Sequence, residues 1–122
     1  MPGGKRFQEL VAQAKEHVHE VDASTAAAEQ QRGAVLIDVR EAEEFGAGHA
    51  PGAKHLSRGT LELKIEEAAP DAQTPIICYC GGGSRSALAA ESLQRMGYSQ
   101  VRSLAGGFKA WREAGLPVAA AE

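Results

Sequence analysis

A short apolar run that ends in a cysteine and three glycines constrains the fold more than any other stretch of this 122-residue chain. Residues 76–79 (Ile-Ile-Cys-Tyr) are mostly strand formers. Cys80 follows, and the glycines at 81–83 allow backbone angles that other residues avoid. The composition after them favours a helix, with Ser84 or Ser86 as its N-cap. The stretch therefore predicts a buried strand, a tight loop and a helix in direct succession.

Cys80 would then lie between the end of a strand and the N-terminus of a helix. Backbone N–H groups of the curled loop point inward at such a place, and the helix dipole adds positive potential. Both effects favour the thiolate, which is the nucleophilic form of a cysteine. Cys80 is therefore the candidate catalytic nucleophile.

The rest of the chain alternates between strand and helix patterns, and no hairpin dipeptide such as Asn-Gly interrupts it. This alternation predicts an α/β fold with a parallel sheet and helices on both faces. Ligands of such sheets bind beyond the carboxyl ends of the strands, so polar residues that follow strand ends share one crevice. The expected helices cover 5–17, 23–31, 41–45, 61–68, 84–96 and 106–111, and the expected strands cover 18–21, 34–39, 53–56, 76–79 and 100–104.

Composition and charge exclude several classes of function. The net charge of −3 without a clustered basic face argues against nucleic-acid binding. The apolar runs are too short to span a membrane, and no signal peptide is expected, so we predict a cytoplasmic protein. The two cysteines are too close in sequence to staple the chain. No second His/Cys cluster completes a metal site, so neither a metal nor another cofactor is expected.

Four short motifs follow one another along the chain. They are Leu-Ile-Asp-Val-Arg-Glu at 36–41 followed by Glu-Phe at 44–45, Gly-His-Ala-Pro-Gly-Ala at 48–53, the stretch 80–85, and Gly-Gly at 106–107 with Trp111, Gly115 and Pro117. Together they resemble the single-domain form of the rhodanese-like sulfurtransferase family over residues 18–118. The resemblance implies a three-layer fold with a central, mainly parallel five-stranded sheet. Residues 1–17 would be an added N-terminal helix, and residues 119–122 a loose tail.

The resemblance also implies that Cys80 carries sulfur as a persulfide. The loop would bind the substrate through backbone N–H groups and through a cation at its far lip. The candidate substrate-binding residues are Gly81, Gly82, Gly83, Ser84, Arg85, Ser86 and, at the mouth of the crevice, Arg58. Arg85 could instead pair with Glu91 or face solvent, and Arg58 could be a solvated surface residue.

The length and the charge of the loop narrow the range of possible substrates. Four residues separate Cys80 from Arg85, one fewer than in the related cradle of protein phosphatases. The shorter ring suits a sulfur atom and fits a tetrahedral phosphate poorly. Family members that favour thiosulfate often carry basic residues inside the loop, whereas Gly81 and Gly82 are neutral. This departure predicts that thiosulfate is a weak donor.

Several residues near these motifs are interpreted as structural. Cys78 fits a small buried strand residue, with a resolving thiol as the alternative. Asp38 and Arg40 would hold the crevice together, with Arg40 reaching the residue at 44 or the cysteine loop. His49 fits a packed turn, and Trp111 would pack with the phenylalanine at 108 in the core.

We therefore expect a sulfurtransferase that moves a sulfane sulfur from thiosulfate or an organic or protein persulfide to cyanide or a thiol through Cys80. The chief alternative is a non-catalytic persulfide-sensing or protein-interaction module of the same fold. Two more candidate functions are a phosphatase or arsenate reductase, and a thiol-disulfide oxidoreductase that uses Cys78 with Cys80.

Overall fold

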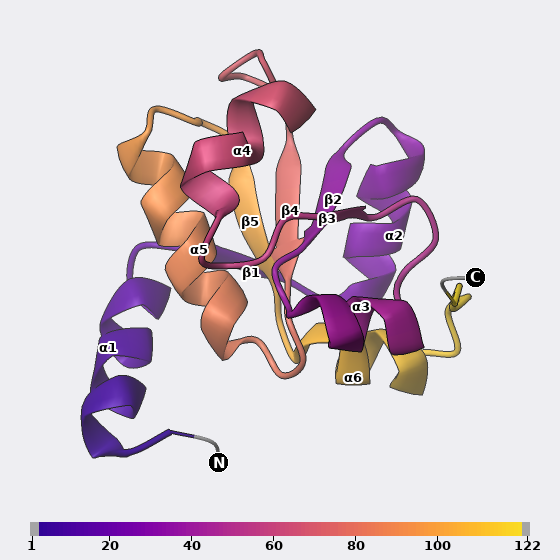
Figure 1. Ribbon diagram of the computed structural model, residues 1–122, viewed down its shortest axis with the longest axis horizontal. Coiled ribbons are helices and arrows are strands. Elements are labelled where there is room, and N and C mark those ends of the chain that lie inside the picture. Colours follow the sequence, from indigo (N-terminus) through magenta and orange to yellow (C-terminus); the bar gives the residue numbers. More distant parts are fainter. Residues whose placement is uncertain (1–2, 121–122) are drawn as a thin grey trace.

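A five-stranded sheet between two layers of helices forms the body of the protein in the computed structural model, which describes residues 3–120 (Figure 1). The strand order is β1-β5-β4-β2-β3, and all neighbouring strands are parallel. The strands are β1 (His19–Val21), β2 (Val35–Asp38), β3 (Lys54–His55), β4 (Ile76–Tyr79) and β5 (Val101–Leu104). The helices are α1 (Lys5–Lys15), α2 (Ala23–Gln31), α3 (Ala42–Ala47), α4 (Leu61–Ala68), α5 (Ser84–Arg95) and α6 (Gly107–Glu113). The predicted three-layer α/β fold is confirmed.

The central strand β4 is buried on both faces, as the continuous apolar run predicts. Ile76 and Cys78 contribute to the core beneath α4 and α5, whereas Ile77 and Tyr79 contribute to the core beneath α2 and α6. All four side chains are at most 1% exposed. Burial of one such isoleucine stabilises the fold by about 1.5–3 kcal/mol, so the strand anchors both layers.

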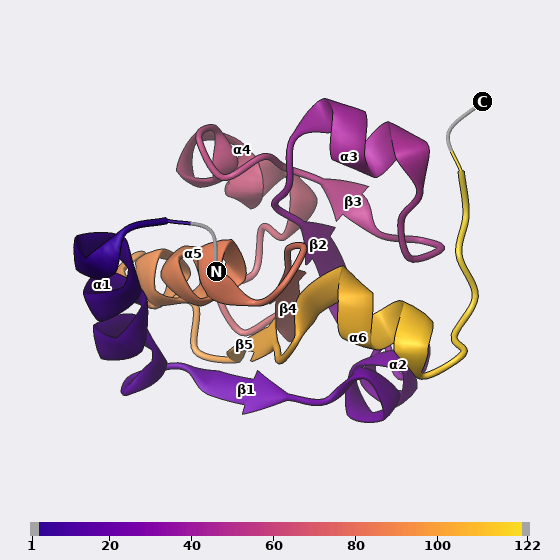
Figure 2. The ribbon, with the colours of Figure 1, turned by 90° about the horizontal axis from the view of Figure 1, so that it is seen from below.

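Helix α1 lies outside this sandwich, alongside α5 (Figure 2). It buries Val11 and Ala14 and leaves Leu10 half exposed. None of the helices within residues 3–120 is long and apolar enough to cross a bilayer.

The structure near the two chain ends is relevant to the expected boundaries of the domain. Ala119, the first residue of the expected tail, exchanges two backbone hydrogen bonds of 2.8 Å with His49. The His49 ring also stacks on Phe45 at 3.7 Å between centroids, as expected for a packed turn. Residues 1–2 and 121–122 of the expected extension and tail lie outside the described residues. The division into an extension at 1–17, a domain at 18–118 and a tail at 119–122 stays a prediction.

A buried ion pair fixes the carboxyl end of β2. The Arg40 guanidinium donates from Nε to Asp38 Oδ1 at 3.0 Å and from Nη2 to Oδ2 at 2.7 Å. Nη2 also donates to the Gly48 carbonyl at 2.7 Å, and the guanidinium carbon lies 4.5 Å from the ring centroid of Phe108. Arg40 therefore bonds Asp38 and the turn at 48, rather than the residue at 44 or the cysteine loop as predicted, because the buried Asp38 carboxylate lies two residues away.

Replacement of Asp38 by asparagine should destabilise the fold strongly, because it leaves the Arg40 charge buried without a counter-charge. We expect a loss of about 3–5 kcal/mol in the free energy of unfolding, measured by urea titration. Glu20→Gln is the matched control, since it removes the exposed Lys15–Glu20 pair at 3.7 Å. That control should cost less than about 1 kcal/mol. Equal small losses in both variants would contradict a stabilising role for the buried pair.

Candidate active site

The Cys80 sulfur lies at the base of the loop that joins β4 to α5. The residue is 1% exposed and follows the carboxyl end of the central strand. Its Sγ accepts hydrogen bonds from the backbone N–H of Gly83 at 3.1 Å and of Ser86 at 3.3 Å. Two N–H groups of the loop thus point at the sulfur, as predicted for a curled loop of this composition.

The start of α5 differs from the expectation that Ser84 or Ser86 caps the helix. The N-cap is Gly83, which has a left-handed backbone (φ +104°), and no side chain caps the helix. Ser84 and Ser86 are instead the first and third residues of α5. The physical reason is that the Cys80 sulfur accepts the N–H of Ser86, a first-turn donor that a side-chain cap would otherwise satisfy.

The N-terminus of α6 holds the other side of the loop. Phe108 N–H donates to the Cys80 carbonyl at 2.7 Å, and Lys109 N–H donates to the Gly81 carbonyl at 3.2 Å. The carbonyl and the following N–H of a trans peptide point in opposite directions, and the described residues contain no cis peptide. The N–H groups of Gly81 and Gly82 are therefore turned away from α6.

Gly107 makes this approach possible. A Cβ atom there would lie 2.5 Å from the Cys80 carbonyl oxygen, and its φ of +60° is left-handed. The sequence analysis places Gly106 and Gly107 at the start of a helix and within a family motif, and it does not predict their contact with the loop. The glycine pair directly after a strand was the available signal.

The hydroxyl of Ser86 lies close to both the Cys80 sulfur and a second hydroxyl, that of Ser103. Ser86 Oγ is 3.4 Å from Cys80 Sγ and 2.8 Å from Ser103 Oγ on β5. Both serines are fully buried. Ser103 was not predicted from the sequence, because a serine in a short strand carries no sign of the partner that the fold gives it.

Arg85 lies against the loop but is already paired. A Cβ atom on Gly81 would be 3.3 Å from Arg85 Nη2, which places the guanidinium beside the loop backbone. The guanidinium donates to both carboxylate oxygens of Glu44, at 2.8 and 3.1 Å. These bonds are the main reason that the pKa of Glu44 falls to about 2. Glu91, which the sequence offered as a partner for Arg85, pairs with Arg95 instead.

Arg58 is paired with a side chain outside the loop. Its Nη1 donates to Glu62 Oε2 at 2.7 Å, and Ser92 donates to the same oxygen at 2.6 Å. Arg58 thus forms its ion pair with Glu62, which lies on α4. The role of Arg58 as an anion contact stays a prediction.

Cys78 is a buried thiol beneath the site. Burial in the core, with a smaller contribution from the neighbouring Cys80, raises its pKa to about 12. Both cysteines are free. Cys78 therefore stays protonated at neutral pH, which suits the interpretation as a small strand residue.

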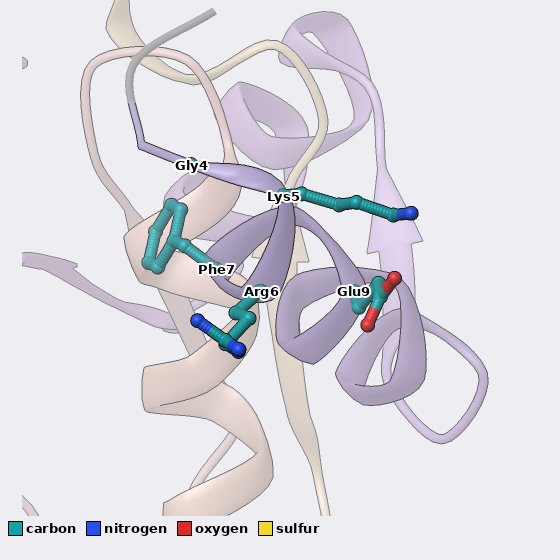
Figure 3. Close-up of a pocket in the computed structure, with 5 residues that line it drawn as sticks. All are labelled: Gly4, Lys5, Arg6, Phe7 and Glu9. Atoms are coloured by element: carbon teal, nitrogen blue, oxygen red, sulfur yellow. The ribbon is translucent and has the colours of Figure 1, made fainter.

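Two surface hollows differ in their relation to this site. A hollow of about 270 Å³ adjoins the loop, since its lining includes Glu44, which pairs with Arg85, and Phe108, which bonds the Cys80 carbonyl. A larger hollow of about 620 Å³ surrounds the start of α1 (Figure 3). The side chains of Lys5, Arg6 and Phe7 diverge there, so they do not converge on one ligand. In residues 3–120 no group of three or more His, Cys, Asp or Glu side chains is arranged to hold a metal ion.

Comparisons with known proteins agree with this geometry. The family model described as the rhodanese-like domain matches residues 22–114. A protein of Pseudomonas putida named thiosulfate sulfurtransferase GlpE is 45% identical over 83 residues, which are 68% of this chain and 74% of the relative. The polysulfide-sulfur transferase homodimer of Wolinella succinogenes has a TM-score of 0.81 at 31% identity, covering 93% of this chain and 87% of that one. A protein of unknown function from Rhodopseudomonas palustris, described as a possible tyrosine phosphatase, also has a TM-score of 0.81, at 32% identity over 98% of this chain and 96% of that one.

The contrast between the two cysteines predicts their reactivity in the folded protein. Iodoacetamide should modify Cys80 much faster than Cys78 in the folded protein at neutral pH, because burial raises the pKa of Cys78 and keeps that thiol protonated. Peptide mass spectrometry after timed labelling measures both sites. Labelling in urea is the control, since both thiols should react once the chain is unfolded. Rapid native labelling of Cys78 would contradict its placement in the core.

Proposed function

Because the chain belongs to the rhodanese-like domain family, we propose that it is a sulfurtransferase whose Cys80 carries the sulfane sulfur as a persulfide. The observation that carries the proposal is the loop geometry: the sulfur lies at the base of a ring of backbone that aims the N–H groups of Gly83 and Ser86 at it. A fixed arrangement of donors favours a negatively charged sulfur at no cost of reorganisation during the reaction.

The reaction proceeds in two displacements. The Cys80 thiolate attacks the outer sulfur of a donor, the donor's S–S bond breaks, and the leaving group departs with the electron pair as sulfite from thiosulfate or as a thiolate from a persulfide. The enzyme then holds a Cys80 persulfide. An acceptor, either cyanide or a thiolate, attacks the outer sulfur, and the Cys80 thiolate leaves with the electron pair.

Within this proposal the loop residues have distinct roles. Gly81, Gly82 and Gly83 let the backbone curl, and the N–H groups from Gly81 to Ser86 face the charge that moves between donor and enzyme. Arg85 provides the cation at the lip of the loop. Ser84 begins the helix that fixes the lip in place.

The same geometry favours sulfur over phosphate chemistry. The cradle leaves four residues between Cys80 and Arg85, one fewer than the related phosphatase cradle, so a tetrahedral phosphate has less room. A polysulfide-sulfur transferase of similar fold also supports the sulfur chemistry. The substrates are then small sulfur compounds, with cyanide, small thiols or a protein thiol as acceptors, and the place of action is the cytoplasm.

Replacement of Cys80 by serine tests the proposal directly. We expect loss of detectable sulfur transfer with little loss of stability, because a serine hydroxyl without a neighbouring base is a poor nucleophile. Intact-protein mass spectrometry after incubation with thiosulfate or polysulfide should show the mass of one added sulfur atom in the parent protein and none in the variant. Cys78→Ser should retain the added sulfur. A folded parent that takes up no sulfur from thiosulfate, polysulfide or an organic persulfide would refute sulfur carriage and favour the protein-interaction alternative. Modification of Cys80 without transfer to any acceptor would favour the persulfide-sensing alternative.

The Glu44–Arg85 pair predicts how the enzyme treats an anionic donor. Thiosulfate should be a weak donor with a high KM, because Gly81 and Gly82 carry no charge and Glu44 occupies the Arg85 guanidinium. Glu44→Gln should lower the KM for thiosulfate several-fold, more so at low salt, and should affect an uncharged organic persulfide much less.

Glu62→Gln is the matched control for that variant, because it releases Arg58 in the same way. Initial rates with both donors at two ionic strengths give the comparison. If only the control lowers the KM, Arg58 is the anion contact instead of Arg85. A parent protein that saturates at micromolar thiosulfate would contradict the argument from the neutral loop.

A further inference from the structure

Two pairs of polar side chains are buried in the described part of the protein. One is the ion pair of Asp38 and Arg40, and the other is the hydroxyl pair of Ser86 and Ser103. The ion pair has a structural task at the end of β2, described above. The hydroxyl pair has no such task, yet it reaches the sulfur of the nucleophile through Ser86 Oγ at 3.4 Å. A buried polar pair beside a reactive atom calls for a chemical explanation.

We propose that Ser103 is a positioning residue that acts through Ser86 to stabilise the charged form of the Cys80 sulfur. The inference rests on the proposed function in that both assign the reaction to Cys80. The Ser86 hydroxyl lies 3.4 Å from the sulfur, and the Ser103 hydroxyl forms a hydrogen bond of 2.8 Å with the Ser86 hydroxyl. Ser103 therefore acts on the sulfur indirectly, through the Ser86 hydroxyl.

The fold brings Ser103 to this place through the strand register. Ser103 on β5 lies opposite Cys78 on β4, and residues opposite one another on parallel neighbours share a face of the sheet. That face is covered by α5, which carries Ser86 in its first turn. The hydroxyl of Ser103 thus reaches the first turn of α5 from beneath.

The protons of the two hydroxyls can be arranged to fit both states of the sulfur. Each serine has one O–H proton to donate and lone pairs that accept. When Cys80 is a thiol, S–H donates to Ser86 Oγ, and the Ser86 hydroxyl donates to Ser103. When Cys80 is a thiolate, the Ser86 hydroxyl turns to the sulfur, and the Ser103 hydroxyl donates to Ser86. Ser103 thus serves as acceptor in one state and donor in the other.

The charged state gains more from this arrangement. A hydrogen bond to an ionised acceptor is about twice as strong as one between neutral groups. A neighbouring bond in the same direction polarises it further in a site shielded from water. Removal of the Ser103 hydroxyl should therefore weaken the thiolate more than the thiol.

Other charged or titratable groups also face the Cys80 sulfur. Arg85, at the first turn of α5, interacts electrostatically with Cys80, and so does the Cys78 thiol from β4. The proposed substitutions at 103 leave both of these groups in place. A change in the reactivity of Cys80 can then be assigned to the missing hydroxyl.

The test compares Ser103→Thr with Ser103→Val in the full chain. Threonine and valine are both β-branched and nearly equal in shape, but only threonine keeps a hydroxyl. The measurement is the rate of Cys80 alkylation by iodoacetamide across the pH range, with the free energy of unfolding measured for each variant. We expect the curve of the valine variant to move to higher pH, with about a five-fold lower rate at neutral pH, the effect of one hydrogen bond. The threonine variant should keep the parent curve.

Two further variants complete the test. Ser103→Ala should shift the curve as valine does, and it also serves if the larger side chains prevent folding. Val101→Ala is the matched control, because it alters a buried position on the same strand and the same face without removing a hydroxyl, and its curve should coincide with the parent's. Coincident curves for threonine, valine and alanine would overturn the proposal. Alkylation needs no sulfur donor, so this result is independent of the persulfide measurement that tests the function.

Discussion

The hydrogen bonds from the start of α6 to the carbonyls of Cys80 and Gly81 are the constraint on which the site depends. They join the loop after β4 to the helix after β5, and they set the direction of the peptide groups that follow Cys80. Gly107 permits this approach, since any Cβ atom there would overlap the Cys80 carbonyl. Hydrogen bonds from α6 therefore fix the loop on one side. On the other side, the Cys80 sulfur fixes it by accepting hydrogen bonds from the N–H groups of Gly83 and Ser86.

The two buried polar pairs lie on opposite faces of the sheet. Asp38 is in register with Tyr79, whose side chain belongs to the core beneath α2 and α6. Ser103 is in register with Cys78, which belongs to the core beneath α4 and α5. One pair thus fixes the carboxyl edge of β2, and the other reaches the Cys80 sulfur. Within residues 3–120 every buried side-chain nitrogen or oxygen has a hydrogen-bond partner, which keeps the burial of these groups from destabilising the fold.

The electrostatics of the site come mainly from the backbone. The loop glycines add no charge, and the Arg85 cation at the lip is matched by Glu44, whose low pKa keeps its carboxylate ionised at neutral pH. A site of this kind stabilises negative charge close to the sulfur through short-range dipoles, and it attracts distant anions weakly.

The local pattern of the sequence was enough to predict the alternating helices and strands, the buried strand at 76–79 and the cysteine loop. Apolar runs and glycines act through neighbouring residues, so their consequences can be predicted without a fold. The cap of α2 is a local contact of the same kind, in which the Asp22 carboxylate accepts the Thr25 N–H at 2.8 Å. Only the tertiary structure decided that Glu44 occupies Arg85 and that Ser103 lies beside Ser86. These contacts join residues on different elements, and strand order and register bring them together. A single sequence carries no record of that register at an isolated serine or glutamate.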